Sequence, residues 1–223
     1  MHLIELLKQL DTNVFLLING LHTSFFDGFM YAVSAKLTWI PLYISVLYVL
    51  IKQWKKEAVW LILALVLCIV ISDQVASGLL KHLVKRLRPS HVDDLRGLVH
   101  LVRDYSGGMY GFASSHASNT VGFALLSSLI LKQRNYTFAI FSWAIITSYS
   151  RIYLGVHYPG DILGGALIGS LAALLCYWVL KRYRSVQLVN NNERTTAEFD
   201  KTIPVWVLGA IFFGIIAYSI FVF

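Results

Sequence analysis

The sequence predicts an all-α protein, a bundle of about six transmembrane helices preceded by a short interfacial helix. Apolar residues make up 57% of the 223 residues and charged residues only 14%, with a mean hydropathy of +0.64. Water-soluble globular proteins carry more charge than this. Several apolar stretches approach the roughly 20 residues that a helix needs to cross about 30 Å of hydrocarbon. Composition therefore predicts a polytopic membrane protein.

The N-terminal segment differs from the apolar stretches that follow it. Residues 2–20 place leucines at helical spacing with charged residues between them, as at Leu3, Leu6 and Leu10. Amphipathic helices of this kind lie in the plane of the membrane interface. Residues 1–10 lack the long apolar core and the small-residue cleavage site of a signal peptide. We expect an interfacial helix here and no cleaved signal peptide.

Six apolar stretches follow, and each is predicted to cross the membrane as a helix. The first contains Lys36 and Pro41, which make its outer half irregular, and the second continues helically past Lys81. Residues 90–111 have the glycines and charges of an ordered loop with turns, and residues 184–202 form a polar linker. The predicted spans begin and end near residues 28–51, 58–81, 115–131, 136–150, 161–180 and 203–223.

The basic residues give a formal net charge of +7, and their positions indicate the partner. They lie almost wholly between the apolar spans, whereas a nucleic-acid-binding protein spreads them over a soluble face. We therefore expect a membrane bilayer and an anionic substrate as partners, and no nucleic acid. The two cysteines, Cys68 and Cys176, lie inside apolar runs, and no residues have the spacing of a zinc site. No metal and no cofactor are expected.

Loop charges also predict an orientation. Lysines and arginines at residues 52–56, 132–134 and 181–184 fall on one side if the spans alternate, and positively charged loops stay cytoplasmic. The other side receives both termini and the loops that hold the remaining polar motifs. Residues 81–103, on that outer side, carry six basic residues against the charge rule. A binding site for an anion would explain this exception.

The first polar motif lies along the second span. Asp73, Ser77 and Lys81 recur every four residues, and Arg88 follows seven residues after Lys81. In a continuous helix these side chains share a face, with Lys81 and Arg88 about 10 Å apart along the axis. Pro89 disfavours helix at the residue before it, so we expect the helix to end at Arg88. The alternative is a basic cluster that binds anionic lipid head groups.

The second motif comes directly before the third span. Ser114 or Ser115 can cap this helix, and His116 follows. The free N–H groups and the dipole at a helix start attract anions, so a phosphate could rest here with a serine hydroxyl donating to it. The simpler interpretation is a capped helix with a histidine at the interface.

The third motif joins the fourth and fifth spans. Pro159 suits the first position of the fifth helix, so Asp161 falls in the first turn and its carboxylate can reach the His157 ring. Arg151 precedes them; the alternative is a capping aspartate beside an unrelated histidine. With alternating spans the three motifs emerge at one membrane face. Cations brought together there repel one another unless a multiply charged anion lies among them.

Together, these motifs resemble the three-part signature of the type 2 phosphatidic acid phosphatase and vanadium haloperoxidase superfamily, in its membrane-bound lipid phosphatase branch. The resemblance covers roughly residues 58–180, the core of a single domain over residues 1–223 with flanks at 1–57 and 203–223. The family usually has Pro-Ser-Gly-His in the middle motif, a pattern from which this chain departs at two positions. The motifs read Lys81-x6-Arg88-Pro89, Ala113-Ser114-Ser115-His116 and Ser150-Arg151-x5-His157-x3-Asp161.

The resemblance implies a metal-independent hydrolase that acts through a phosphohistidine. His157 would attack phosphorus, Asp161 would fix the His157 ring, and His116 would protonate the leaving oxygen and then activate water. A backbone donor survives the change from glycine to serine in the middle motif, so activity is expected. The phosphoryl oxygens would be held by five residues, namely Lys81, Arg88, Ser114, Ser115 and Arg151.

The resemblance also implies a class of substrate, a phosphate monoester or diphosphate of an envelope lipid. Undecaprenyl diphosphate, lipid A, phosphatidylglycerol phosphate and phosphatidate all fit. We expect the chain in a bacterial-type inner (plasma) membrane with the site facing the periplasmic or outer side. The alternatives are a transporter or binding protein for an anion or lipid phosphate, with Asp73 lining the path, and a vanadate-dependent haloperoxidase.

Overall fold

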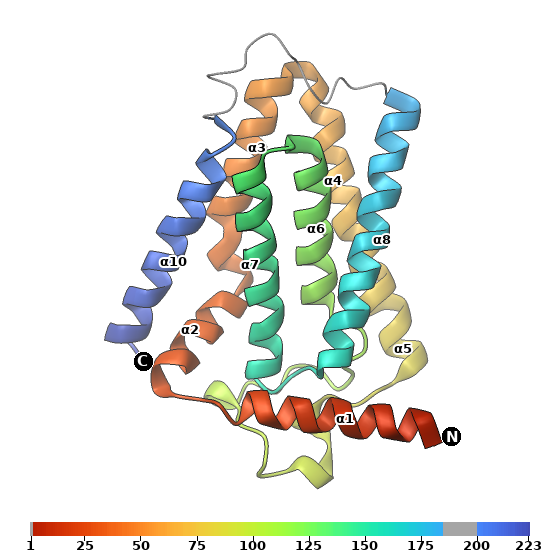
Figure 1. Ribbon diagram of the computed structural model, residues 1–223, viewed down its shortest axis with the longest axis vertical. Helices are drawn as coiled ribbons and strands as arrows, with labels where there is room; N and C mark the ends of the chain where they lie inside the picture. The colour runs from red at the N-terminus through yellow and green to blue at the C-terminus, as the bar shows by residue number, and fades with distance from the viewer. Residues whose placement is uncertain (1, 185–199) are drawn as a thin grey trace.

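The computed structural model describes residues 2–184 and 200–223, which form a bundle of long helices with a shorter helix lying across one end (Figure 1). Within these ranges there are helices and no β-strand, so the all-α prediction is confirmed. The main helices are α1 (His2–Asn19), α2 (Ser24–Ser34), α3 (Ile40–Trp54), α4 (Ala58–Asp73), α5 (Lys81–Val84), α6 (Ser115–Leu131), α7 (Arg134–Tyr153), α8 (Pro159–Arg184) and α10 (Ile203–Phe221).

The first predicted span is two helices. α2 ends at Ser34, the backbone of Ala35 is extended, and one turn of 3-10 helix (Lys36–Trp39) leads into α3. Pro41 lies in the first turn of α3, where the proline nitrogen has no hydrogen bond to lose. The irregularity predicted around Lys36 and Pro41 is confirmed. Because of this break, α2 is a separate helix from α3 and lies at the end of the bundle that α1 crosses (Figure 1).

The second predicted span is helical from Ala58 onward, but the helix changes from α to π and back to α. A π-helical segment (Gln74–Leu80) joins α4 to α5. The prediction that the helix ends at Arg88 is wrong, because α5 ends at Val84. Lys85 takes left-handed φ and ψ of 50° and 30° and donates its N–H to the Lys81 carbonyl, which closes the helix. Arg88 is extended, as a residue before proline prefers.

The later elements follow the sequence closely. α6 has the predicted bounds, α8 begins at Pro159, and α7 is longer than predicted at both ends. Ser114 is the N-cap of α6, since its side chain accepts from the Ala117 N–H at 3.5 Å. Residues 90–111 form an ordered loop with three short 3-10 turns. Most of the predicted polar linker, residues 185–199, lies outside the described residues.

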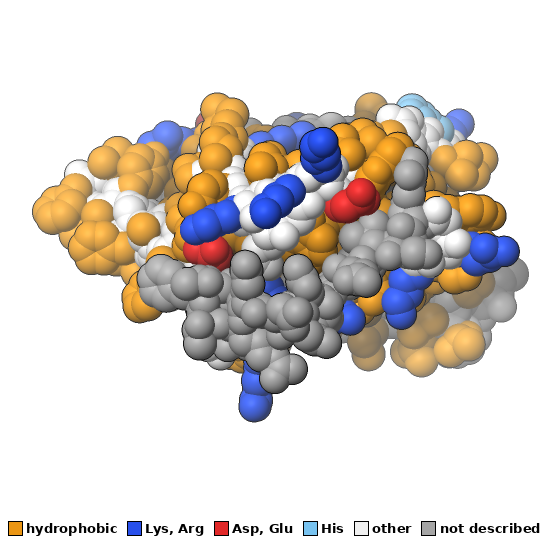
Figure 2. All heavy atoms as spheres, turned by 90° about the horizontal axis from the view of Figure 1, so that it is seen from above, with side chains coloured by type: hydrophobic (Ala, Val, Ile, Leu, Met, Phe, Trp, Pro, Cys, Tyr) orange, Lys and Arg blue, Asp and Glu red, His pale blue; other side chains and the backbone are white. Residues whose placement is uncertain are grey.

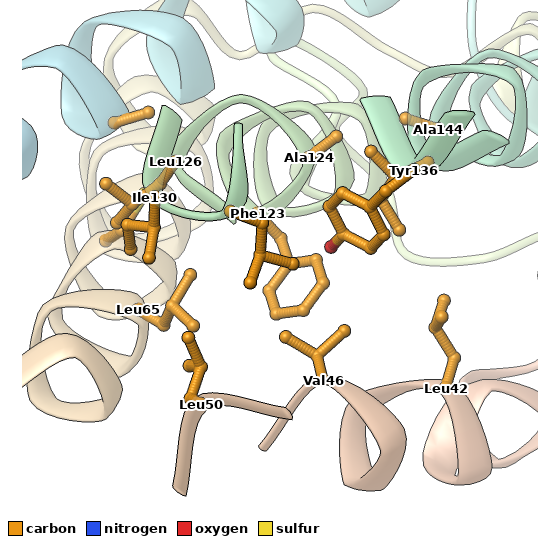
Figure 3. Close-up of a cluster of buried hydrophobic side chains, with 14 of the residues drawn as sticks. Leu42, Val46, Leu50, Leu65, Phe123, Ala124, Leu126, Ile130, Tyr136 and Ala144 are labelled. Carbon is orange, nitrogen blue, oxygen red and sulfur yellow. The ribbon is translucent and has the colours of Figure 1, made fainter. Parts of the chain in front are cut away.

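The main apolar core fills the bundle between α3, α4, α6, α7 and α8. Figure 3 shows side chains from α3 and α6 pointing toward one another, with Val46 facing Phe123. The Phe123 ring packs edge-to-face with Tyr43 and Trp143, with centroids 5.1 Å and 6.1 Å away. This packing fixes α6 and α7, whose ends carry the second and third motifs.

Glycines on α8 let α6 approach very closely. A Cβ at Gly165 would lie 2.3 Å from the Ser114 carbonyl oxygen, and one at Gly169 would lie 2.1 Å from that of Ser118. Small residues of this kind allow close helix contacts in membranes. The start of α6 is therefore held directly against the start of α8, which brings the second motif to the third.

Three described stretches are long and apolar enough to cross a membrane: Lys36–Val84, Pro159–Tyr183 and Ile203–Phe221. The first contains α3 and α4, which run side by side after a turn at Lys55 (Figure 1). The chain is an integral membrane protein. The number of spans, about six, stays a prediction. Figure 2 looks onto the end opposite α1, where lysine and arginine side chains gather among apolar ones.

Candidate active site

The three motifs meet at the end of the bundle that α1 crosses. They lie where α5 ends, α6 begins, α7 ends and α8 begins (Figure 1). His157 lies in the turn between α7 and α8, and its side chain is 1% exposed. Gly155, at φ +77°, makes this turn, and a Cβ there would lie 2.7 Å from Val99. The ordered loop thus packs directly on the turn that carries His157.

Hydrogen bonds fix the orientation and the tautomer of the His157 ring. Nε2 lies 3.2 Å from Arg88 Nη1, and Nδ1 lies 3.3 Å from Asp161 Oδ2. An arginine side chain only donates, so Nε2 accepts and the ring proton is on Nδ1, donated to the carboxylate. This places an unprotonated nitrogen toward Arg88, the state that a nucleophilic imidazole needs.

Electrostatics favour the same state. Burial lowers the pKa of His157 well below its usual value, and the positive charges of Arg88, Arg151 and Lys81 lower it further. The ring is therefore neutral at neutral pH in the absence of an anion.

Arg88 is held rigidly. Besides His157, its guanidinium donates to the Val156 and Tyr110 carbonyls, each at 3.2 Å. A Cβ at Gly107, where φ is +67°, would lie 2.8 Å from Arg88 Nη1. The 90–111 loop therefore covers the Arg88 guanidinium at Gly107, where a side chain would not fit. Burial lowers the pKa of Arg88, and the charge of Arg151 adds to that effect.

Arg151 reaches the site from the last turn of α7 and is 2% exposed. It donates to Tyr105 OH at 3.0 Å and to the Ser34 hydroxyl. Its Nε is buried without a hydrogen-bond partner in the described part of the chain. A buried donor with no acceptor is costly, and this N–H is free to donate to an anion.

The other predicted residues surround the same space. Lys81 Nζ lies 3.4 Å from Ser77 Oγ and interacts electrostatically with Arg88 and Arg151. His116 lies near the Ser34 backbone and close enough to Arg151 and His157 to feel their charges. The two histidines therefore lie close enough to influence one another, His116 from the first turn of α6 and His157 from the turn between α7 and α8.

The serines of the second motif have separate environments. Ser114 is fully buried, and its backbone N–H donates to the Asp161 carbonyl at 3.0 Å. Its hydroxyl oxygen accepts from Ala117, which leaves the hydroxyl proton available. Ser115 is the first residue of α6, so its backbone N–H has no acceptor within the helix.

The charges are unbalanced on one side of the site. Among the described residues, none of the three predicted phosphate-binding cations has a carboxylate within ion-pair distance. Like charges held close together and partly buried favour a multiply charged anion between them. Within the same residues, no group of three or more His, Cys, Asp and Glu side chains has the geometry of a metal site.

Several contacts that shape the site are not predicted by the sequence motifs, above all those of Arg86. Arg86 Nη1 lies 3.1 Å from Asp161 Oδ1, and Nη2 lies 2.7 Å from Asp11 Oδ2. A helix reaching Arg88 would turn Arg86 away, whereas in extended backbone residues two apart share a face. Ser34 and Tyr105, which hold Arg151, come from distant segments that no local pattern identifies.

Comparisons with known proteins identify the family of the chain. Residues 57–185 match the model of the PAP2 superfamily. The chain is 40% identical over 179 residues to the lipid A 4'-phosphatase of Bacteroides thetaiotaomicron, covering 79% of this chain and 80% of that protein. It is 38% identical over 182 residues to the lipid A 4'-phosphatase of Porphyromonas gingivalis, covering 81% and 77%.

A solved structure shares the fold. The crystal structure of Aquifex aeolicus LpxE superposes with a TM-score of 0.59 at 25% identity, covering 76% of this chain and 95% of that one. The family match extends over more than half of the chain and includes all three motifs. The chain therefore belongs to the PAP2 superfamily and is one of its membrane lipid phosphatases.

Proposed function

We propose that the chain hydrolyses a phosphate monoester of a lipid A-type envelope lipid through a phosphohistidine at His157. The observation that carries this mechanism is the orientation of His157, whose unprotonated Nε2 faces Arg88 while Nδ1–H faces Asp161. The substrate is proposed because two relatives that match about four-fifths of the chain are named for lipid A.

In the first half-reaction, Nε2 of His157 attacks phosphorus in line with the ester oxygen. The new P–N bond forms as the P–O bond breaks. His116, which takes up a proton together with the anionic substrate, donates that proton to the departing oxygen. The His157 ring becomes positive, and the carboxylate of Asp161 at Nδ1 stabilises it. Charge on the three phosphoryl oxygens is stabilised by the cations and by the donors of the second motif, namely Lys81, Arg88, Arg151, Ser114 and Ser115.

In the second half-reaction, a water molecule attacks the phosphohistidine. His116, now neutral, takes a proton from this water while the P–O bond forms and the P–N bond breaks. Inorganic phosphate leaves, and His157 returns to its neutral Nδ1–H state. Every step uses side chains of the described site, and none needs a metal ion or a cofactor.

The proposal places the site at the outer face of an inner (plasma) membrane. Positive loops stay on the cytoplasmic side, and the end opposite α1 carries the exposed lysines and arginines of the α3–α4 and α6–α7 turns (Figure 2). The site end then faces the periplasm or the outside.

Purified protein in detergent with chelator tests the function directly. We expect phosphate release from lipid A, read by mass spectrometry as loss of one phosphate, and slower release from undecaprenyl diphosphate, phosphatidylglycerol phosphate and phosphatidate. His157→Ala abolishes release, whereas His82→Ala, an exposed histidine of α5, serves as the matched control and retains it. Release from none of these lipids, or equal activity in the two variants, would contradict the proposal.

A further inference from the structure

One face of α1 contacts the segment that carries His157. Asp11, Phe15 and Asn19 lie four residues apart, so they share a face of this helix. Asp11 Oδ1 accepts from the Gly160 N–H at 2.7 Å, Phe15 packs edge-to-face on Tyr158 at 5.4 Å, and Asn19 Nδ2 donates to the Tyr153 carbonyl at 2.7 Å. These contacts lie before and after His157 in the chain. The helix crossing the bundle end thus holds the turn of the nucleophile (Figure 1).

Asp11 is also the last member of a row of alternating charges. Arg86 bridges the Asp11 carboxylate at 2.7 Å and the Asp161 carboxylate at 3.1 Å, and Asp161 meets His157 Nδ1 at 3.3 Å. The Arg86 guanidinium also lies over the Tyr158 ring, 3.9 Å from its centroid. Each carboxylate takes a different nitrogen of Arg86, so the guanidinium has one orientation only while both are present.

Membrane anchoring alone does not explain this arrangement. Leu3, Leu7 and Leu10 of α1 are 67%, 58% and 59% exposed, so the apolar surface of the N-terminal half faces away from the bundle. At the middle of the helix, Asp11 is directed at the site, and it lies beside a position with no side chain. A Cβ at Gly160 would lie 2.8 Å from Asp11 Oδ2. The close approach therefore depends on glycine there.

We propose that Asp11 and Arg86 are positioning residues through which α1 orients the nucleophile. Asp11 fixes Arg86, Arg86 fixes the Asp161 carboxylate, and the carboxylate holds the His157 proton on Nδ1 with Nε2 toward the phosphoryl site. Without Asp11, the Arg86 side chain, 25% exposed, turns to water and releases one oxygen of Asp161. This inference rests on the proposed role of His157. It makes the interfacial helix part of the catalytic apparatus.

The test compares two amide substitutions on the same helix. Asp11→Asn removes the charge that faces Arg86, whereas Glu5→Gln removes one that pairs with Lys8 in solvent. We expect kcat to fall about 10-fold in Asp11→Asn, with KM within about twofold of wild type, because a small misplacement of a reacting group slows the chemical step. Glu5→Gln leaves both constants unchanged.

A double-mutant cycle shows whether Asp11 acts through Arg86. Arg86→Gln alone lowers kcat by at least the factor seen for Asp11→Asn, and adding Asp11→Asn to it changes kcat by less than about twofold. Gly160→Ala supplies a second route, because its Cβ displaces the Asp11 carboxylate without removing any charge. We expect Gly160→Ala to lower kcat in the same way as Asp11→Asn. It therefore replaces Asp11→Asn as the test if that variant does not insert into the membrane.

The outcomes separate this inference from the proposed function. An active wild type, an inactive His157→Ala, and kcat values in Asp11→Asn and Gly160→Ala equal to that of Glu5→Gln would overturn the positioning role alone. Additive effects of Asp11→Asn and Arg86→Gln would also overturn it. A wild type that releases no phosphate from any lipid would instead contradict the proposed function.

Discussion

The two nitrogens of the His157 ring face regions with opposite charge patterns. Beyond Nδ1 the signs alternate, from Asp161 to Arg86 to Asp11, and each charge has a partner within 3.3 Å. Beyond Nε2 lie Arg88 and then Arg151, both cations, with no carboxylate within ion-pair distance in the described part of the chain. One region is complete without a ligand and the other is not.

Positioning groups and binding groups can be distinguished in such a site by their charge patterns. Paired charges satisfy one another and hold a geometry, whereas like charges held together need an anion to offset their repulsion. Changes on the Nδ1 side should therefore alter the rate of the chemical step. Changes on the Nε2 side should alter the affinity for the phosphoryl group as well.

The largest effect is expected from the histidines between the two regions. His157→Ala and His116→Ala should each lower kcat by about 10³-fold or more. When catalytic residues act as a unit, replacing one of them removes most of the rate enhancement that the unit provides. Phosphate release from detergent-solubilised protein measures this, with thermal unfolding as the control for folding. Near-wild-type turnover in His157→Ala would remove the proposed nucleophile.

A loss of about 10²-fold in kcat/KM is expected for Arg151→Gln, because this change removes one preorganised donor to the developing charge. Arg134→Gln is the matched control, since Arg134 begins the same helix at its opposite end and is exposed. Steady-state kinetics with one lipid phosphate compare the two. Equal kcat/KM values would show that Arg151 does not contact the phosphoryl group.

Vanadate separates the two regions by binding. The anion mimics five-coordinate phosphorus, so its inhibition constant should rise about 10-fold in Arg151→Gln, on the Nε2 side. In Arg86→Gln, on the Nδ1 side, the constant should stay within about threefold of wild type although kcat is reduced. Inhibition curves at fixed substrate give both values. An equal rise of the vanadate inhibition constant in both variants would contradict the separation of binding groups on the Nε2 side from positioning groups on the Nδ1 side.

The smallest effect concerns pH. Burial and the charge of Arg88 lower the pKa of His157, so removing that charge in Arg88→Gln raises this pKa back toward its usual value. Less of the ring is then neutral in mild acid, and the acid limb of the kcat/KM profile moves up by about one pH unit or less. Arg96→Gln, exposed in the same loop, should leave the limb unmoved. An unchanged or lowered limb in Arg88→Gln would contradict this assignment.

Much of the site could be predicted where its geometry is local. The contact between His157 and Asp161 follows from a helix that starts at Pro159, and the cap at Ser114 follows from residue type at a helix start. The bounds of α6 also follow from its apolar run. In each case a few consecutive residues decide the conformation.

The rest depends on contacts between distant segments. The left-handed turn at Lys85 ends α5 early and brings Arg86 to Asp161, but lysine has no special preference for that conformation. Asp11 reaches Arg86 only because α1 folds back across the bundle end (Figure 1). The amphipathic pattern of α1 predicts an interfacial helix, and it does not reveal which residue of that helix meets the site.

The mechanism depends on a covalent bond between Nε2 of His157 and phosphorus. Phosphohistidine survives alkali, so the direct measurement is to quench turnover of a ³²P-labelled lipid phosphate with alkali and locate the label by peptide mass spectrometry. We expect a phosphoryl group on His157, absent from His157→Ala and retained in His82→Ala. A phosphoryl group on any other residue would contradict it, as would turnover in which no labelled peptide forms.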